Sequence, residues 1–343
     1  MSTAAAGIVA PSGVYLRSCL APFEPLLSRP DVTDIYVNRP GELWIETLGG
    51  NIERHGDAAL NELILARLAR QIAALTHQGI SREHPLLAAR LPDGSRIQIV
   101  APPATRGPLT LAIRRQVAPS LTLQDYAAGD FFERTSAGPQ AKSADEQLRT
   151  LVGEHRFAEA LALAVRLRRN IIVSGGTSTG KTTFLNALLR EIPSDERLIV
   201  IEDTPELVIG HDNSVGLISV RSELGEAKVT ANDLVSASLR MRPDRIILGE
   251  LRGPEAFAFL RAINTGHPGS MTTIHADSPE SAIEQLVMLV LTGGARLSRD
   301  DVRHHVHQSI DLFVQLSRTG GRRGVRSVIL GERAEPCIRD PVA

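Results

Sequence analysis

Residues 175–182, GGTSTGKT, have the composition and spacing of a loop that binds phosphate groups. They fit the pattern G-x-x-x-x-G-K-[ST], which acts as a phosphate loop when a strand precedes it and a helix follows. The apolar run NIIVS comes before this loop, and TTFLNALLREI, which has helical spacing, comes after it. Glycines allow backbone N–H groups to surround phosphates, and a helix N-terminus favours negative charge.

In such a loop the lysine, here Lys181, reaches the β- and γ-phosphates of a nucleotide, and the hydroxyl of Thr182 supplies an oxygen ligand to Mg²⁺. The sequence therefore predicts a nucleotide-binding site. The residues expected to line it are Gly175, Gly176, Thr177, Ser178, Thr179, Gly180, Lys181, Thr182 and Thr183.

Two later strand-like runs end in acidic residues. RLIVIEDTPEL (197–207) carries Glu202 at its end, and RIILGELRGPEA (245–256) carries Glu250. In open parallel sheets catalytic groups lie just past the carboxyl ends of the strands, where a carboxylate can hold Mg²⁺ or orient the attacking water. Either acid alone could be an exposed strand-end charge. Because both follow a phosphate loop, we expect Glu250 to serve the Mg²⁺ and water site as the base, with Glu202 as the rival base.

The stretch GHPGSMTTIHA (266–276) holds two histidines that could be metal ligands or a proton-transfer pair. SMTTI reads as a buried strand, which places His275 at its carboxyl end and His267 at the opposite end. A strand rises ~3.3 Å per residue, so the two side chains are too far apart to share a metal ion. We therefore expect His275 to sense the γ-phosphate or its water and His267 to be a turn histidine.

The elements that must position these residues fall into two halves of the chain. From about residue 151 helices alternate with buried strands, which is typical of a parallel α/β sheet. Residues 31–115 indicate a small α+β unit, with a turn at Arg39-Pro40-Gly41. We expect strands at 34–38, 43–46, 86–91, 96–101 and 109–115, and an amphipathic helix over 60–75.

The segment TSAGPQAKSADEQ is small and polar and contains glycine and proline, so it predicts a linker between the halves. The expected organisation is an N-terminal α+β domain over 1–134, a linker over 135–150 and an α/β domain over 151–343.

Composition narrows the class of protein. The chain has 343 residues, 43% hydrophobic residues and a formal net charge of −1, which is ordinary for a globular protein and gives no overall attraction to nucleic acid. Cys19 and Cys337 form neither a zinc module nor a disulfide framework, which favours a reducing compartment. We find no signal peptide and no apolar run near the ~18 residues of a membrane span. These features predict a protein of the cytosol or of a membrane face.

Four motifs in one order carry a family resemblance: GGTSTGKTT, VIEDTPEL, MRPDRIILGELRGPEA and TGHPGSMTTIHADSP. They resemble the Walker A motif, Asp box, Walker B motif and His box of the secretion-ATPase superfamily. LPDGSRIQ and LAIRR resemble in particular the hexameric ATPases of type IV secretion and conjugation systems. The resemblance covers roughly residues 30–330.

This resemblance implies a RecA-like P-loop NTPase domain after the smaller α+β domain, which hydrolyses ATP with Mg²⁺ in a homohexamer of two stacked rings. It also implies that Arg96 and Arg114 of the N-terminal domain reach the phosphates, and that Arg242 lies at the nucleotide site. From pattern alone, Arg96 and Arg114 lie on the polar phase of their strands and could be solvated. ATP binding and hydrolysis would then move the N-terminal domain against the ATPase domain.

The resemblance further implies partners among other ATPases and inner-membrane components of a secretion machine, and peripheral association with the cytoplasmic face of that membrane. The basic run RLRRN (166–170) could be a lipid-binding patch, but a helix end explains it as well. Flp and type IV pilus-assembly ATPases are the alternative family, since their motifs are nearly the same.

Other classes of protein fit less well. A RecA-like nucleic-acid motor needs a basic strand-binding surface, whereas the run RTGGRRGVR (318–326) is better explained as a hairpin turn. We expect no direct sequence-specific binding to nucleic acid. A small-molecule kinase would need a lid that we do not find, and a non-catalytic nucleotide switch would not need Glu250.

Overall fold

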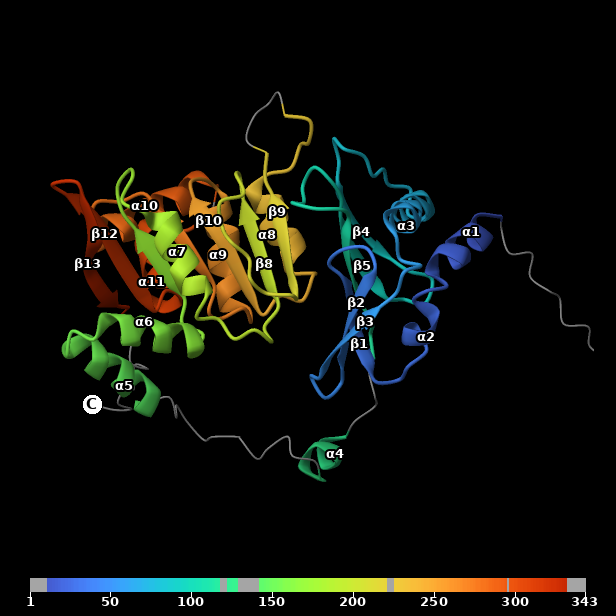
Figure 1. Cartoon of the computed structure of the whole chain (residues 1–343), viewed down its shortest axis with the longest axis horizontal. Helices are drawn as coiled ribbons and strands as arrows, with labels where there is room; N and C mark the ends of the chain where they lie inside the picture. Colours follow the sequence, from blue (N-terminus) through green and yellow to red (C-terminus); the bar gives the residue numbers. More distant parts are fainter. Residues whose placement is uncertain (1–10, 118–121, 129–141, 221–224, 295, 332–343) are drawn as a thin grey trace, which may run out of the picture. The chain divides into compact units, whose positions relative to one another are not determined.

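The computed structural model describes residues 11–117, 122–128, 142–220, 225–294 and 296–331. Contacts along the chain define two compact units (Figure 1). Unit 1 comprises Met1–Val117, Asp203–Pro205 and Asn213–Arg242, and unit 2 comprises Ala118–Glu202, Glu206–Asp212 and Pro243–Ala343.

Unit 1 is built on an antiparallel sheet with the strand order β3-β2-β1-β6-β5-β4. Asn61 caps α3 by accepting a hydrogen bond from the N–H of Ile64, and the helix buries Leu68 and Ile72, which the helical spacing predicts, together with Leu65. The α+β prediction for this region is therefore confirmed. The elements are α1 (Pro11–Leu20), α2 (Glu24–Leu27), β1 (Val32–Val37), β2 (Glu42–Thr47), β3 (Ile52–Gly56), α3 (Glu62–Leu75), β4 (Leu86–Arg90), β5 (Arg96–Val100) and β6 (Thr110–Arg114).

Unit 1 also contains a segment from the second half of the chain, with β9 (Ser214–Ile218) and α8 (Ala231–Ser238). A bridge joins Thr105 to Leu217, and the N–H of Ile218 donates to the carbonyl of Ala104 at 2.9 Å. The side chain of Arg242 pairs with Glu46 at 2.6 Å. The sequence predicts a single boundary at the linker over 135–150, whereas these long-range contacts attach residues 213–242 to the N-terminal sheet.

Unit 2 contains a parallel sheet in which β12, β7, β11, β10 and β8 are neighbours in that order, with β13 antiparallel beside β12. β7 and β8 are buried along their whole length, as expected for a sheet covered on both faces. The α/β prediction is confirmed. Its strands are β7 (Ile171–Ser174), β8 (Leu198–Glu202), β10 (Arg245–Leu251), β11 (Met271–Ile274), β12 (Leu312–Thr319) and β13 (Arg322–Leu330).

The helices of unit 2 follow and precede these strands in the predicted alternation. None of the helices among the described residues is long and apolar enough to cross a membrane. They are α4 (Leu123–Ala128), α5 (Lys142–Gly153), α6 (Phe157–Arg166), α7 (Lys181–Leu189), α9 (Glu255–Asn264), α10 (Pro279–Thr292) and α11 (Arg299–Ser309).

The expected linker is corrected at its C-terminal end. Residues 129–141 lie outside the described residues, whereas residues 142–150 belong to α5. This helix buries Leu148 and Leu151, and Asp145 forms an ion pair with Arg169. The polar composition of the segment suggested irregular chain, but two leucines at helical spacing and one ion pair are enough to attach a helix to unit 2.

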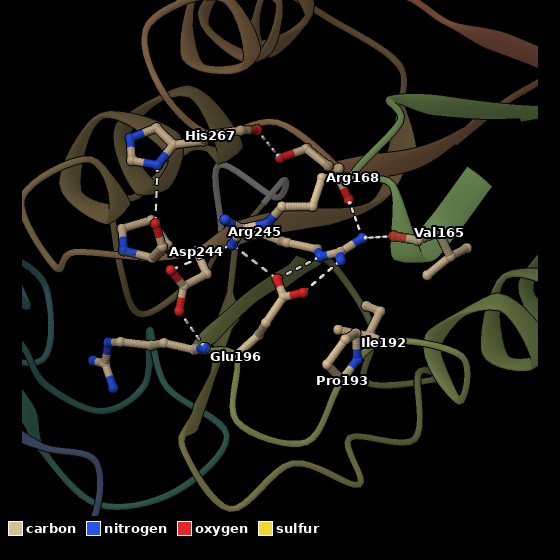
Figure 2. Close-up of polar contacts among 12 residues, drawn as sticks. Val165, Arg168, Ile192, Pro193, Glu196, Asp244, Arg245 and His267 are labelled. Carbon is tan, nitrogen blue, oxygen red and sulfur yellow. Dashed lines mark hydrogen bonds and ion pairs between the residues drawn. The ribbon is translucent and has the colours of Figure 1, made fainter. Parts of the chain in front are cut away.

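Arginines at the amino ends of the unit 2 strands are held by carboxylates (Figure 2). The fully buried side chain of Arg245 donates to both carboxylate oxygens of Glu196, at 2.7 and 2.6 Å, and to the carbonyl of Val165 at 2.7 Å. Arg168 pairs with Glu196 at 2.9 Å and with Asp244 at 3.3 Å. A buried charge is tolerated when it is paired and hydrogen-bonded, so this cluster fixes the edge of the sheet opposite the phosphate loop.

Candidate nucleotide-binding site

The predicted phosphate loop connects the end of β7 to the start of α7. Gly180, at the N-cap of α7, has a left-handed backbone with φ 93°, which glycine adopts without strain. A Cβ atom at Gly175 would lie 2.5 Å from Thr179 Oγ1 and 3.2 Å from Leu316 Cβ. Both glycines are therefore required by the loop's own geometry, and the first residues of α7 present free backbone N–H groups at its end.

Lys181 lies inside this loop. Its Nζ donates to the carbonyl of Gly175 at 3.0 Å, and Thr179 Oγ1 donates to the carbonyl of Gly176 at 2.9 Å. Burial lowers the pKa of Lys181, and the negative charge of Glu250 opposes that shift. A phosphate anion in the loop would compensate the partly desolvated ammonium, so the residues present fit a bound nucleotide.

Glu202 and Glu250 both stand at strand ends, as predicted, but in different surroundings. Glu202 is buried, and its Oε1 accepts hydrogen bonds from the N–H groups of Glu206 and Leu207 at 3.0 and 2.9 Å. Glu250 forms an ion pair with Arg252, and its side chain remains 16% exposed. Glu202 therefore shapes the turn after β8, whereas Glu250 is reachable by water and is electrostatically coupled to Lys181.

The two histidines lie at opposite ends of β11, as the strand prediction requires. His275 directly follows Ile274, the last residue of β11, and is exposed at the carboxyl end of the sheet. His267 lies in the turn at the other end, where its Nδ1 is 3.0 Å from the carbonyl oxygen of Pro243 (Figure 2). The structure thus brings His275, and not His267, to the sheet edge that carries Glu250.

Three arginines of unit 1 stand in register on neighbouring strands: Arg90 on β4, Arg96 on β5 and Arg114 on β6. We call them the arginine row. The next residue in register is Asp34 on β1, 4.0 Å from the guanidinium of Arg114. Burial raises the pKa of Asp34, while the charge of Arg114 opposes the increase.

The arginine row lines a cavity of about 540 Å³ within unit 1, together with Arg240. In the part of the chain that the structure describes, neither Arg90, Arg96 nor Arg240 forms an ion pair with a carboxylate. The cavity therefore has an excess of positive charge, which suits an anion. Arg242, the third arginine implied by the resemblance, is instead held by Glu46, which also accepts from the hydroxyl of Tyr36.

Arg90 and Arg240 were not predicted as site residues. Arg90 could have been found from the sequence, because LAARLPDGSRI folds as a hairpin in which Arg90 and Arg96 face each other across the turn. Arg240 gave no such signal, since its place beside the row depends on the attachment of residues 213–242 to unit 1.

A glycine-rich loop between a parallel strand and a helix, with acidic residues at the ends of neighbouring strands, defines a P-loop NTPase with a RecA-like ATPase domain. The family Type II/IV secretion system protein matches residues 18–320. The chain belongs to this family, which confirms the resemblance seen in the four motifs.

Individual relatives agree with this assignment. The chain is 38% identical over 326 residues to the type IV secretion system protein VirB11 of Bartonella henselae, covering 90% of this chain and 91% of the relative. It is 37% identical over 316 residues to PtlH of Bordetella pertussis, covering 90% and 92%. The crystal structure of the VirB11 ATPase from the Brucella suis type IV secretion system, in complex with sulphate, matches with a TM-score of 0.86 at 36% identity, covering 93% and 95%.

Proposed function

We propose that this protein hydrolyses ATP to power a type IV secretion or conjugation machine. The observation that carries the proposal is Lys181, a partly desolvated ammonium that lies inside the loop between β7 and α7 and donates to the carbonyl of Gly175. The relatives named as type IV secretion system proteins, over nine-tenths of the chain, support the process that the ATPase serves.

The loop N–H groups and Lys181 hold the β- and γ-phosphates, and Thr177, Ser178 and Thr183 complete the lining. Thr182 and Glu250 would hold Mg²⁺, Glu250 directly or through water, and the ion would neutralise charge on the phosphates. Glu250 accepts the proton of the attacking water, because its carboxylate is accessible while Glu202 is occupied with two backbone N–H groups. His275 senses the γ-phosphate from the end of β11.

Arg96 and Arg114 respond to the terminal phosphate, and Arg242 acts near the same nucleotide. The excess positive charge around the arginine row supports this role. ATP binding and hydrolysis then change the position of the N-terminal domain within a homohexamer. We propose other ATPases and inner-membrane components as partners, and a location on the cytoplasmic face of the inner membrane.

Separate substitution of Glu250 and Glu202 by glutamine tests which of them is the base. Glu250→Gln should bind ATP almost as the wild type does and hydrolyse it about 10²–10⁴-fold more slowly, because the proton acceptor is lost. In Glu202→Gln the amide oxygen still accepts the two N–H groups, so turnover should fall much less. Phosphate release and nucleotide binding measure both effects. Wild-type turnover in Glu250→Gln with slow turnover in Glu202→Gln would move the base to Glu202.

Stimulation of phosphate release by single-stranded DNA would favour a nucleic-acid motor instead.

A further inference from the structure

The hairpin of β12 and β13 brings an arginine to the phosphate loop. The turn at Gly320-Gly321 confirms the hairpin expected for residues 318–326. Arg323 Cδ lies 3.6 Å from the place where a Cβ atom on Gly180 would stand. The guanidinium begins one bond beyond that Cδ, so the cationic group of Arg323 lies beside the residue that precedes Lys181.

Contacts of β12 hold the hairpin against the loop. Leu316 packs against Gly175, and Ser174 Oγ donates to Gln315 Oε1 at 2.6 Å. The Nε2 of Gln315 donates to the carbonyl of Ala276 at 3.1 Å, just beyond the end of β11. All of these residues belong to unit 2, so Arg323 keeps its place relative to the loop whatever unit 1 does.

The charge of Arg323 is not explained by the protein's own groups. Arg323 stands directly opposite Arg318 in the β12–β13 pair. Like charges directly opposite each other destabilise an antiparallel pair. Among the described residues neither arginine has an ion-pair partner, and both are exposed. Because no group of the described chain balances this unfavourable pair beside the phosphate loop, its positive charge is available to an anion from outside the chain.

We propose that Arg323 binds the diphosphate portion of the nucleotide, which ATP and ADP share. The inference rests on the proposed nucleotide site. The guanidinium is a planar fork that suits phosphate oxygens, and the loop, Lys181 and Arg323 form one set within unit 2. Arg323 therefore acts on both nucleotides, in contrast to Arg96 and Arg114, whose proposed role depends on the terminal phosphate.

Binding of ADP and of inorganic pyrophosphate to the full chain tests this role by calorimetry. Arg323→Ala should raise the dissociation constants of both ligands about tenfold, the loss expected for a charge-assisted hydrogen bond. Arg322→Ala is the matched control, because it removes the same charge from the adjacent residue, whose side chain points to the other face of β13. Arg322 stands opposite Thr319, so no pair of like charges is involved. The Arg322→Ala variant should bind both ligands nearly as the wild type does.

The unfolding midpoint separates ligand binding from a structural role. Without ligand, Arg323→Ala should be as stable as the wild type or slightly more stable, since the opposed charges are relieved, and the ADP-induced rise in midpoint should shrink. A loss of ligand-free stability would show a structural role and overturn the inference.

Weaker ADP binding with unchanged pyrophosphate binding would place Arg323 on the base or sugar. Equal losses of binding in both arginine variants would reflect net charge alone. If the wild-type chain binds no nucleotide, the proposed function fails as well.

Discussion

The buried arginine cluster of unit 2 and the arginine row of unit 1 differ in how their charge is balanced. At the amino ends of the unit 2 strands, Arg245 is buried and bound by both oxygens of Glu196. In unit 1 the arginine row lines a cavity, and among the described residues its one carboxylate partner is Asp34, 4.0 Å from Arg114. Desolvating a charge without a partner is expensive, so only the paired arginines can be buried. The row remains exposed and available to an anion.

The same contrast occurs within unit 2, between its two sheet edges. Arg168 and Arg245 share the carboxylate of Glu196 at one edge, whereas Arg323 faces Arg318 next to the phosphate loop at the other. The arginines bound by Glu196 thus hold the unit 2 sheet together. The arginine row and Arg323, for which we expect a phosphate, are exposed, and among the described residues only Arg114 of this set has a carboxylate partner. The following substitutions test this distinction.

The largest effect on stability should come from Arg245→Met. Removing one partner of a buried ion pair costs about 3–5 kcal/mol, and we expect about 3 kcal/mol because Arg168 still contacts Glu196. Denaturant unfolding of the full chain measures the loss. Arg245→Met combined with Glu196→Leu should recover part of it, since no charge is left unpaired. A single variant as stable as the wild type would show that the pairing does not hold this edge.

A smaller effect, on turnover instead of stability, is expected at Arg114. Arg114→Ala should reduce ATP turnover by at least about tenfold. This loss is smaller than the factor of about 10³–10⁵ that a sole arginine finger contributes, because Arg96 and Lys181 remain. Its neighbour Arg115 donates to the carbonyl oxygens of Arg29 and, at 2.9 Å, Val32. Arg115→Ala should therefore lower the unfolding midpoint and leave turnover of the folded protein nearly unchanged.

Phosphate release and thermal unfolding of the two variants give the comparison. If Arg114→Ala and Arg96→Ala both hydrolyse ATP at the wild-type rate, the arginine row is a set of surface charges and the proposed response to the terminal phosphate is wrong.

The smallest effect should come from a paired but solvated carboxylate. Hydrogen bonds from Arg29 and then His55 lower the pKa of Glu53 from 4.5 to about 2. A carboxyl group with a lowered pKa stabilises the fold above its unfolded pKa, and this contribution disappears as the pH falls from 4.5 to about 2. Glu53→Gln should lower the unfolding midpoint slightly at pH 7, and the difference from the wild type should close over that range. A difference that stays constant down to pH 2 would contradict the assignment.

The sequence predicted the elements whose signals are local. Apolar runs gave β7 and β8, and the glycine-lysine pattern gave the loop between β7 and α7. It missed β3, because IERHG is almost wholly exposed and shows no alternation. A strand that buries nothing is held by its neighbour's backbone, which a hydrophobic pattern does not report.

Site residues followed the same division. The strand-end positions of Glu202 and Glu250 were predicted because strand ends are visible in the sequence. The difference in their surroundings was not predicted, since it depends on which N–H groups Glu202 meets. Arg323 was assigned to a hairpin turn, which is correct locally. Its place beside Gly180 is a contact between residues far apart in the chain, which no local pattern encodes.

The attachment of residues 213–242 to unit 1 has a consequence for how the gene can be divided. A fragment that stops at residue 134 lacks β9 and α8, and so loses the contacts that β9 makes with Ala104 and Thr105. Recombination between relatives at a single crossover between residues 117 and 213 would combine the N-terminal sheet of one parent with the 213–242 segment of the other. Functional chimaeras in this family should therefore arise from exchanges that transfer both segments together.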